Sequence, residues 1–368
     1  MLFHSESEWF FVKVLIANAC VLAAVLALLI VLLVRTGDPS APSTPKGDDV
    51  TTTVVTNTTT TAKKPTASTT RMPTRPSTSS EASSVLVNTP IAGEMAQDAL
   101  TQIKELCSAS GGRVSFMYID LETGYSIEHR ADRSYQAASV IKAPYVKWLL
   151  SSGVDGAEKL TMTASDKQGG SGIIDKEAAG TQFTVNQLME YAIRYSDNTA
   201  YYLLNKRFGF KDFNAYAETL GITANKAGNC TLSFPRPRFG YLSARDIALY
   251  MEDIAKYIAS GSESAKKLKT WMMSSSEERQ LTDAFSGKNV LYGAQGNAPV
   301  DYHHDVAHKY GDTKNIENAF HDGAIVFADK TFVLAVATSL EPFTTESVEV
   351  FHELAFQINK IHYALHAG

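Results

Sequence analysis

Residues 91–368 are predicted to adopt an α+β fold, with one mixed layer of strands and helices and one helical lobe. Three observations predict this fold. Two strand-like segments follow an amphipathic helix, a long helical stretch comes next, and three short apolar segments precede a closing helix. Strands that are split by a helical insertion indicate two packed layers, and the cleft between them is the natural place for a functional site.

The first half of this region begins with a helix at 93–108, whose apolar residues recur at helical spacing. Residues 113–129 alternate apolar and polar side chains around a Leu-Glu-Thr-Gly turn, which predicts two paired strands. Residues 139–150 are again predicted to be helical, although Pro144 interrupts them. The helical stretch that follows extends to about residue 276 and includes four clear segments: 185–193, 200–208, 213–220 and 243–259.

The second half of this region is again predicted to contain strands. Residues 306–310, 323–328 and 331–338 are short, apolar and rich in β-forming side chains, and 329–330 would form the tight turn between the last two. Residues 347–365 are predicted to form the closing helix because their apolar side chains share one face.

The first ninety residues are predicted to lie outside this fold. Residues 14–34 are almost wholly apolar, and as a helix they would be about 31 Å long, which matches a hydrocarbon core of about 30 Å. They therefore predict a single membrane span, with 1–13 as a short cytoplasmic tail. A cleaved signal peptide is the alternative, but its apolar core is normally only about 7–15 residues long.

Residues 35–90 are rich in Thr, Ser, Pro and Lys and contain few large apolar side chains. Such a composition cannot offset the entropy lost on ordering, so it predicts a disordered stalk. Stalks of this kind usually lie outside the cytoplasm, and we expect the folded domain to stand outside the cell membrane.

Charge and cysteine content exclude several classes of protein. The formal net charge of −5 gives no sign of the basic surface of a nucleic-acid-binding protein, so no nucleic-acid partner is expected. Three cysteines exclude a disulfide-dense scaffold. Cys107 and Cys230 could pair with each other or could remain as buried free thiols.

Ser139 and Lys142 place a hydroxyl and an amine three residues apart, on one side of a predicted helix that follows a strand. Burial would lower the pKa of Lys142, and its amine could then take the proton of Ser139 and make the hydroxyl a nucleophile. The same Ser-x-x-Lys spacing begins at Ser43 and at Ser264. The position of Ser139 at the start of an apolar helix distinguishes it from both.

Two further motifs follow along the chain. Ser196-Asp197-Asn198 lies in the helical stretch, and any of its three residue types could also serve as a simple helix cap. Lys309-Tyr310-Gly311 lies at the end of a predicted strand and by itself would be an ordinary strand end.

Taken together, the three motifs resemble class A β-lactamases and the wider family of penicillin-recognising serine enzymes, whose signature is Ser-x-x-Lys, Ser-Asp-Asn and Lys-Thr-Gly. Residues 170–173 and 321–326 also resemble segments of that family. The resemblance extends from about residue 93 to the end of the chain. It implies a β-lactamase/transpeptidase-like fold, with an antiparallel sheet flanked by terminal helices and an inserted all-helical lobe.

The resemblance also implies catalytic roles for matching residues. Ser139 would be the acylated nucleophile and Lys142 its proton acceptor, while Ser196 would pass a proton to the leaving nitrogen. Lys309 would keep the site positive and attract a substrate carboxylate.

Substrate binding is implied for a second set of residues, and no cofactor is expected. Asn198 would hold the side-chain amide of a β-lactam or a peptidoglycan peptide, and Tyr310 and Gly311 would line the same site. The backbone N–H groups of Ser139 and Asp312 would form the oxyanion hole, where loss of one donor typically costs about 10²–10³ in rate.

The sequence departs from this family at two places. Class A enzymes release the acyl group with a loop glutamate, but the corresponding residues 221–240 contain no Asp or Glu. Tyr310 stands where the family has threonine, which changes the shape of the carboxylate site. We therefore expect Ser139 to be acylated by a β-lactam and to release the acyl group slowly.

Other residues allow competing interpretations. His303, His304 and His308 suggest a metal site, because residues four apart share a helix face, but a strand is expected there, so histidines on the surface or at the rim of the cleft are the expectation. Arg236 and Arg238 could bind phosphates or simply lie on a solvated loop.

Three functions remain: a serine hydrolase, a β-lactam receptor with a long-lived acyl-enzyme, and a pseudoenzyme that binds cell-wall peptide without chemistry. The intact residues Ser139, Lys142, Ser196 and Lys309 weigh against the third.

Overall fold

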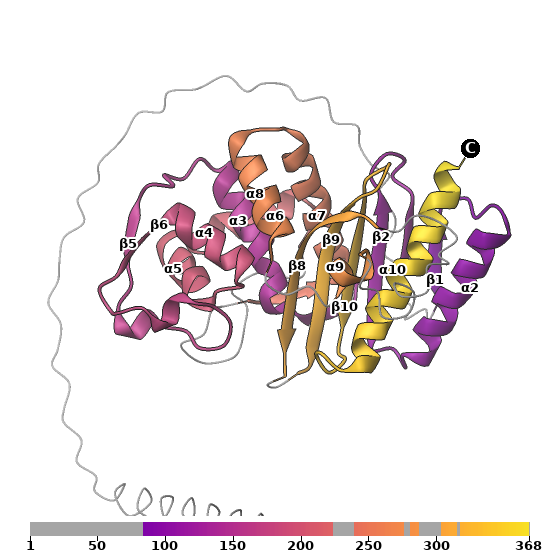
Figure 1. Cartoon of the computed structure of the whole chain (residues 1–368), viewed down its shortest axis with the longest axis horizontal. Helices are drawn as coiled ribbons and strands as arrows, with labels where there is room; N and C mark the ends of the chain where they lie inside the picture. The colour runs from indigo at the N-terminus through magenta and orange to yellow at the C-terminus, as the bar shows by residue number, and fades with distance from the viewer. Residues whose placement is uncertain (1–83, 224–238, 276–279, 287–302, 315–316, 368) are drawn as a thin grey trace, which may run out of the picture. The chain divides into compact units, whose positions relative to one another are not determined.

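The computed structural model describes residues 84–223, 239–275, 280–286, 303–314 and 317–367 (Figure 1). The predicted tail, the predicted span at 14–34 and most of the predicted stalk lie outside these residues and stay predictions. Within the ranges just given, no helix combines the length and the apolar character needed to cross a membrane.

A six-stranded antiparallel sheet forms the centre of the fold, with the strand order β1-β3-β2-β10-β9-β8. The chain enters it through a hairpin and returns to it with three consecutive strands. Its strands are β1 (Val85–Asn88), β2 (Val114–Asp120), β3 (Ser126–His129), β8 (Asp305–Thr313), β9 (Ala319–Phe327) and β10 (Phe332–Thr338).

Helices cover both faces of this sheet. The terminal helices α2 (Glu94–Ala109) and α10 (Thr345–His366) lie side by side against one face, and α7 (Ala244–Ala259) packs on the other (Figure 1). Strand β10 is buried along its whole length and divides its side chains between two cores. Val333 and Ala335 join the core shared with α7, whereas Leu334 and Val336 join the core under α2 and α10. A strand covered on both faces reads as a continuous apolar run, which is why its pattern is so clear in the sequence.

The inserted lobe is mostly helical and contributes to the larger of the two cores. Tyr145 lies near its centre, where its ring packs against those of Tyr201 and Phe213 at 5.4 and 5.2 Å between centroids. The lobe and its flanks contain α3 (Lys142–Ser151), α4 (Val185–Arg194), α5 (Asn198–Phe208), α6 (Lys211–Thr219), α8 (Glu263–Met273) and three 3₁₀ helices: η1 (Ala138–Ile141), η2 (Ala164–Asp166) and η3 (Ile174–Lys176). The four-residue helix α9 (Leu281–Ala284) lies between this lobe and β8 in the chain.

The structure confirms the α+β class and the order of the long elements, and it corrects two details. Residues 85–88 are not stalk, because they form the edge strand β1 paired with β3. The lobe is not purely helical, since two short ribbons join it: β4 (Ser134–Gln136) pairs with β7 (Tyr241–Ser243), and β5 (Lys159–Thr161) pairs with β6 (Gln182–Thr184). Strands of three residues are too short to show an alternating pattern, and the Val-Leu-Val run of β1 does not alternate.

Candidate active site

Ser139 lies in η1, directly after β4 and directly before α3, as its position in the sequence predicts. Its side chain is only 8% exposed. The preceding residue, Ala138, adopts a left-handed backbone conformation with φ of 47°, which is unusual without glycine and typical of functional turns. The segment is also held from the sheet side, because the buried ring of His321 donates from Nε2 to the carbonyl of Gln136 at 2.9 Å.

Ser196 occupies the junction between α4 and α5, where its hydroxyl lies beside two of the other predicted catalytic residues. Its side chain is fully buried and its backbone is left-handed, with φ of 49°. The Nζ atoms of Lys142 and Lys309 each lie 3.2 Å from Ser196 Oγ, although the three residues come from α3, the α4–α5 junction and β8. One hydroxyl therefore joins two buried amines that are far apart in the sequence.

The surroundings of Lys142 oppose its positive charge. The residue is 0% exposed, and burial together with the nearby charge of Lys309 holds the pKa of its amine well below the usual range. Its Nζ also donates to Asn198 Oδ1 at 2.8 Å and to the backbone carbonyl of Ser196. The rings of Phe239 and Tyr201 stack on each other beside it, at 5.4 and 5.9 Å from Nζ. A buried amine with a lowered pKa is the form that can accept a proton near neutral pH.

Asp197, the middle residue of the second motif, has a structural role instead. Its Oδ1 accepts the N–H of Ala200 and caps α5, as the simpler interpretation of this motif predicts. Its Oδ2 accepts the N–H groups of Ile173 and Ile174 at 2.6 and 2.9 Å. The adjacent Gly172 has φ of 129°, and a Cβ there would lie 2.4 Å from the Asp197 carboxyl carbon. The motif thus fixes the 170–173 loop to the start of α5.

Asn198 faces both the buried lysine and the loop. While Oδ1 accepts from Lys142, Nδ2 donates to the carbonyl of Gly169 at 2.9 Å. Its backbone N–H donates to the carbonyl of Ser171 at 3.0 Å. These contacts fix the orientation of the amide before any substrate arrives.

Strand β8 supplies the third motif. Lys309 is fully buried and donates to the carbonyl of Tyr310 at 2.9 Å as well as to Ser196. The ring of Tyr310 lies 3.8 Å from Lys309 Nζ and is itself 3% exposed. Tyr310 therefore places an aromatic ring against the ammonium group, where the related families have a small hydroxyl side chain.

Gly311 explains how β8 comes so close to η1. A Cβ at this position would lie 2.6 Å from the backbone nitrogen of Ser139 and 2.7 Å from that of Val140. Only glycine permits this contact between the strand and the turn that holds Ser139. The next residue, Asp312, is half-buried, and burial raises the pKa of its carboxyl group while Lys309 and Lys142 oppose that rise.

Sequence reasoning missed several supporting residues. The aromatic pair Tyr201 and Phe239 beside Lys142 comes from two segments that no local pattern connects, although Tyr201 is one helical turn after Asn198. The hydrogen bonds of His321 to both Gln136 and the N–H of Thr338 likewise depend on the packing of β9.

The metal interpretation of His303, His304 and His308 depends on helical spacing, but His308 lies in β8, and in a strand residues four apart are separated by roughly 13 Å. The expectation of surface histidines holds for the exposed His303 and is wrong for His308, which is buried. His304 contacts Asn359, whereas His308 contacts Asp322.

Two other residue groups fall partly outside the described ranges. Cys107 is a buried free thiol, and burial raises its pKa to about 12. Cys230, Arg236 and Arg238 lie outside the described residues, as does most of the 221–240 loop.

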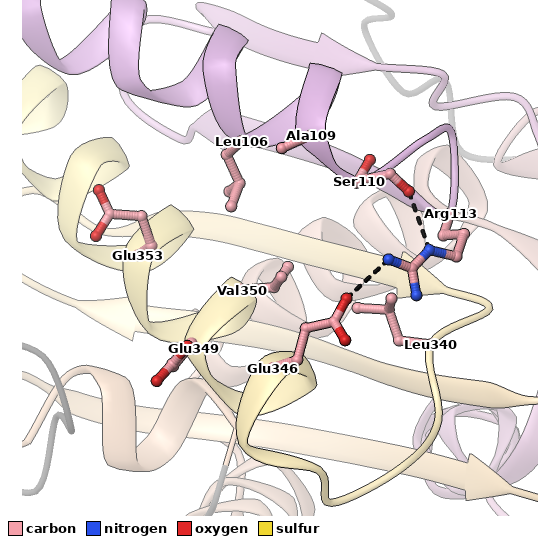
Figure 2. Close-up of a pocket in the computed structure, with 9 residues that line it drawn as sticks. All are labelled: Leu106, Ala109, Ser110, Arg113, Leu340, Glu346, Glu349, Val350 and Glu353. Carbon is pink, nitrogen blue, oxygen red and sulfur yellow. Dashed lines mark hydrogen bonds and ion pairs between the residues drawn. The ribbon is translucent and has the colours of Figure 1, made fainter.

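A separate pocket of about 330 Å³ lies between α2 and α10 (Figure 2). Arg113 borders it, donating to Glu346 at 2.7 Å and to the carbonyl of Ser110 at 3.1 Å. Leu106 and Val350 supply apolar walls. This pocket shares no residue with the Ser139 site.

Comparison with known proteins gives a consistent picture. A model of the beta-lactamase enzyme family matches residues 98–361. The ROB-1 β-lactamase of Haemophilus influenzae is 35% identical over 98 residues, which span 26% of this chain and 32% of that relative. The chain thus matches about a third of the length of this curated relative.

Solved structures share the fold at lower identity. A β-lactamase from Sphaerobacter thermophilus aligns with a TM-score of 0.59 and 20% identity, over 72% of this chain and 96% of that one. PBP-A aligns with a TM-score of 0.58 and 19% identity, over 72% of this chain and 96% of that one. A mutant of PBP-A, solved as an acyl-enzyme complex with penicillin G, aligns with a TM-score of 0.57 and 19% identity, over 72% of this chain and 97% of that one. The β-lactamase/transpeptidase-like fold is therefore confirmed.

Proposed function

This chain belongs to the beta-lactamase enzyme family, and from that premise we propose that it is a serine hydrolase in which β-lactams or D-alanyl peptide amides acylate Ser139. One observation carries the proposal: the buried amines of Lys142 and Lys309 converge on Ser196 Oγ beside the turn that holds Ser139. This arrangement supports proton transfer between three side chains in a site closed to bulk water.

The proposed acylation moves protons through Lys142 and Ser196. Ser139 Oγ attacks the carbonyl carbon of the substrate, and its proton passes to the neutral amine of Lys142. As the C–N bond of the amide or lactam breaks, Ser196 gives its proton to the leaving nitrogen and is reprotonated from Lys142. The lowered pKa of Lys142 supports this cycle, because the amine must lose and regain a proton near neutral pH.

Binding and charge stabilisation fall to the remaining residues. Lys309 would attract a substrate carboxylate, and Asn198 would bind the side-chain amide. The backbone N–H groups of Ser139 and Asp312 would stabilise the oxyanion, and the close approach at Gly311 supports this pairing. Tyr310, whose ring lies against Lys309, would set a substrate preference different from that of enzymes with threonine.

We propose that release of the acyl group is slow. Residues 221–240 contain no Asp or Glu that could activate a water molecule. This composition also supports a second candidate, a non-hydrolytic protein that binds β-lactams or cell-wall peptides through a long-lived acyl-enzyme. Penicillin G forms an acyl-enzyme with the PBP-A mutant of similar fold, which supports acylation as the shared step.

We further propose that residues 14–34 anchor the protein in the cell membrane and that residues 35–83 hold the domain outside the cytoplasm. The apolar run and the Thr/Ser/Pro-rich composition support this placement.

Intact-mass spectrometry after incubation with penicillin tests the proposed chemistry. We expect one covalent adduct per chain that persists for many minutes and is absent from Ser139→Ala. A wild-type protein without adduct, or an adduct that survives in Ser139→Ala, would contradict acylation at this residue. Rapid turnover of a chromogenic cephalosporin would contradict slow release and would exclude the non-hydrolytic candidate.

A further inference from the structure

The last turn of α10 carries two histidines that meet a buried carboxylate of the sheet. His362 and His366 are four residues apart on the helix and thus share one face. Asp120, the last residue of β2, is 0% exposed, and its Oδ2 lies 2.5 Å from His366 Nε2 and 3.4 Å from His362 Nδ1. One ligand atom from each of the three side chains lies within 4.8 Å of the other two.

The groups around this cluster hold the three ligand atoms in a suitable orientation. His362 Nε2 donates to the carbonyl of Lys330 at 2.8 Å, so in the neutral ring the lone pair is on Nδ1, which faces Asp120. Metal-binding histidines almost always donate their second ring nitrogen to a carbonyl or carboxylate in this way.

The carboxylate is fixed in the same manner. Asp120 Oδ1 accepts the N–H groups of Glu122 and Thr123 at 2.9 and 2.8 Å, and Oδ2 is thereby directed at the two histidines. Since His362 Nε2 donates to Lys330, the Tyr118 hydroxyl donates to Nδ1 at 2.8 Å, and a bound metal ion would take the place of this hydrogen bond. His366 is the most exposed of the three ligands, with 19% of its side chain accessible, and it gives an ion access from solvent.

We propose that Asp120, His362 and His366 bind one zinc ion, which fastens the end of α10 to the β2–β3 and β9–β10 turns. Two imidazoles and one carboxylate are a common zinc ligand set, and two histidines four apart on a helix are a common spacing for it. Zinc–ligand bonds of about 2.0–2.2 Å place neighbouring ligand atoms roughly 3.4 Å apart. The 2.5 Å pair of Asp120 and His366 would therefore open, the 3.4 Å pair of Asp120 and His362 would stay, and the two imidazole nitrogens would move closer together. This site differs from the histidines at 303–308 that the sequence suggested, and it is independent of the proposed acylation.

The site would act on stability. Lys330 belongs to the segment between β9 and β10, while Asp120 precedes the turn to β3, so a metal here joins three segments that meet at one end of the sheet. Metal binding that requires the folded arrangement of its ligands adds its free energy to folding.

Zinc titration of the full chain, stripped of metal with a chelator, tests this proposal. We expect about one zinc per chain, and a melting temperature that rises by roughly 5–10 °C at zinc concentrations about 100 times the dissociation constant. Magnesium at the same concentration should leave the melting temperature unchanged, because it prefers oxygen ligands.

A pair of histidine variants assigns the zinc to this cluster. His366→Gln, at a partly exposed helix end, should weaken zinc binding by at least about tenfold and remove the shift in melting temperature, since even an outer partner is worth about 10–100-fold. His303→Gln, an exposed histidine outside the cluster, should bind zinc as the wild type does.

Three results would overturn the proposal: no zinc bound by the wild-type chain, an equal shift in His366→Gln, or a shift lost in His303→Gln. Since the first result comes from the unmodified protein, the proposal does not depend on the folding of a variant.

Discussion

Lys142 on the lobe side of the sheet and Asp120 at its other helix layer are both fully buried ionisable side chains. The pKa of Lys142 is lowered well below its usual range by burial and by Lys309, which disfavours its charge. Burial alone would raise the pKa of Asp120, but the N–H of Thr123 and the ring of His366 hold it below the usual range, which favours its charge. Both pKa values are therefore lowered, but the shift favours the neutral form of Lys142 and the charged form of Asp120.

The difference separates the proposed acylation site, where a proton must move, from the proposed metal site, which would act on stability. A cation placed beside another cation stores an unfavourable interaction that proton transfer can relieve. A carboxylate held by backbone N–H groups and imidazoles has little reason to change its protonation near neutral pH, so it joins segments of the fold.

Replacing Lys142 is the strongest way to test this comparison. We expect Lys142→Met to slow acylation by about 10²–10⁴-fold, because it removes the proton acceptor, while the melting temperature changes little. A stopped-flow or gel assay with a fluorescent penicillin measures the rate, and calorimetry measures the stability.

Lys147, on the same helix, is the matched control. Its Nζ lies 2.6 Å from Asp253 Oδ2, which is partly exposed and also accepts from the Tyr216 hydroxyl, so Lys147→Met should cost about 1–3 kcal/mol of stability. Its acylation rate per folded molecule should stay near wild type. The comparison fails if the two variants lose rate and stability in the same proportion.

A substitution in the core under the terminal helices α2 and α10 should lower the stability of the protein without changing its acylation rate. Phe351 on α10 is 0% exposed and packs against Phe320 at 5.1 Å between ring centroids. Phe351→Ala should cost about 3–5 kcal/mol in denaturant unfolding, with acylation by the folded fraction unchanged. A matching loss of acylation rate would show that the two sides of the sheet are coupled.

Gly311 tests the geometry of the Ser139 turn. A methyl group there would collide with backbone atoms of Ser139 and Val140, which cannot move aside as a flexible side chain can. We expect Gly311→Ala to slow acylation by about 10²-fold, the usual cost of displacing reacting groups by about 1 Å. Wild-type acylation kinetics in this variant would refute the close approach.

The smallest expected effect is on the pH dependence of acylation, which tests the coupling between Lys142 and Lys309. Lys142 must be neutral to accept a proton, so the rate should rise with pH through a pKa below the usual lysine value. Lys309 lowers this pKa, so in Lys309→Met the rise should move to higher pH. A pH–rate profile that keeps its midpoint in the variant would contradict the coupling between the two amines.

Local patterns in the sequence account for most of the fold. The buried strand β10 and the long helices α7 and α10 show clear periodicity, so their positions were predictable within a few residues. Strand β1 and the ribbons β4–β7 and β5–β6 could not be predicted. The sequence of β1 does not alternate, the ribbon strands have too few residues to show a pattern, and their pairing depends on distant partners.

Each motif likewise identified residues but not their arrangement. Nothing local to Ser196 shows that its hydroxyl meets two amines. The helix cap by Asp197 was predictable from residue type, but its hold on the 170–173 loop was not. The histidine cluster of α10 carries a helical His-x-x-x-His spacing, yet its carboxylate partner comes from a strand more than two hundred residues earlier.

The sequence by itself determined the α+β class, the three motifs and the absence of acidic residues in the 221–240 loop, because these depend on local composition and spacing. Tertiary structure alone decided which amines share a hydroxyl, why Gly311 must lack a side chain and where Asp120 meets α10. Those features arise from the packing of distant segments, and the pKa of a buried group depends on which charges that packing brings within a few ångströms.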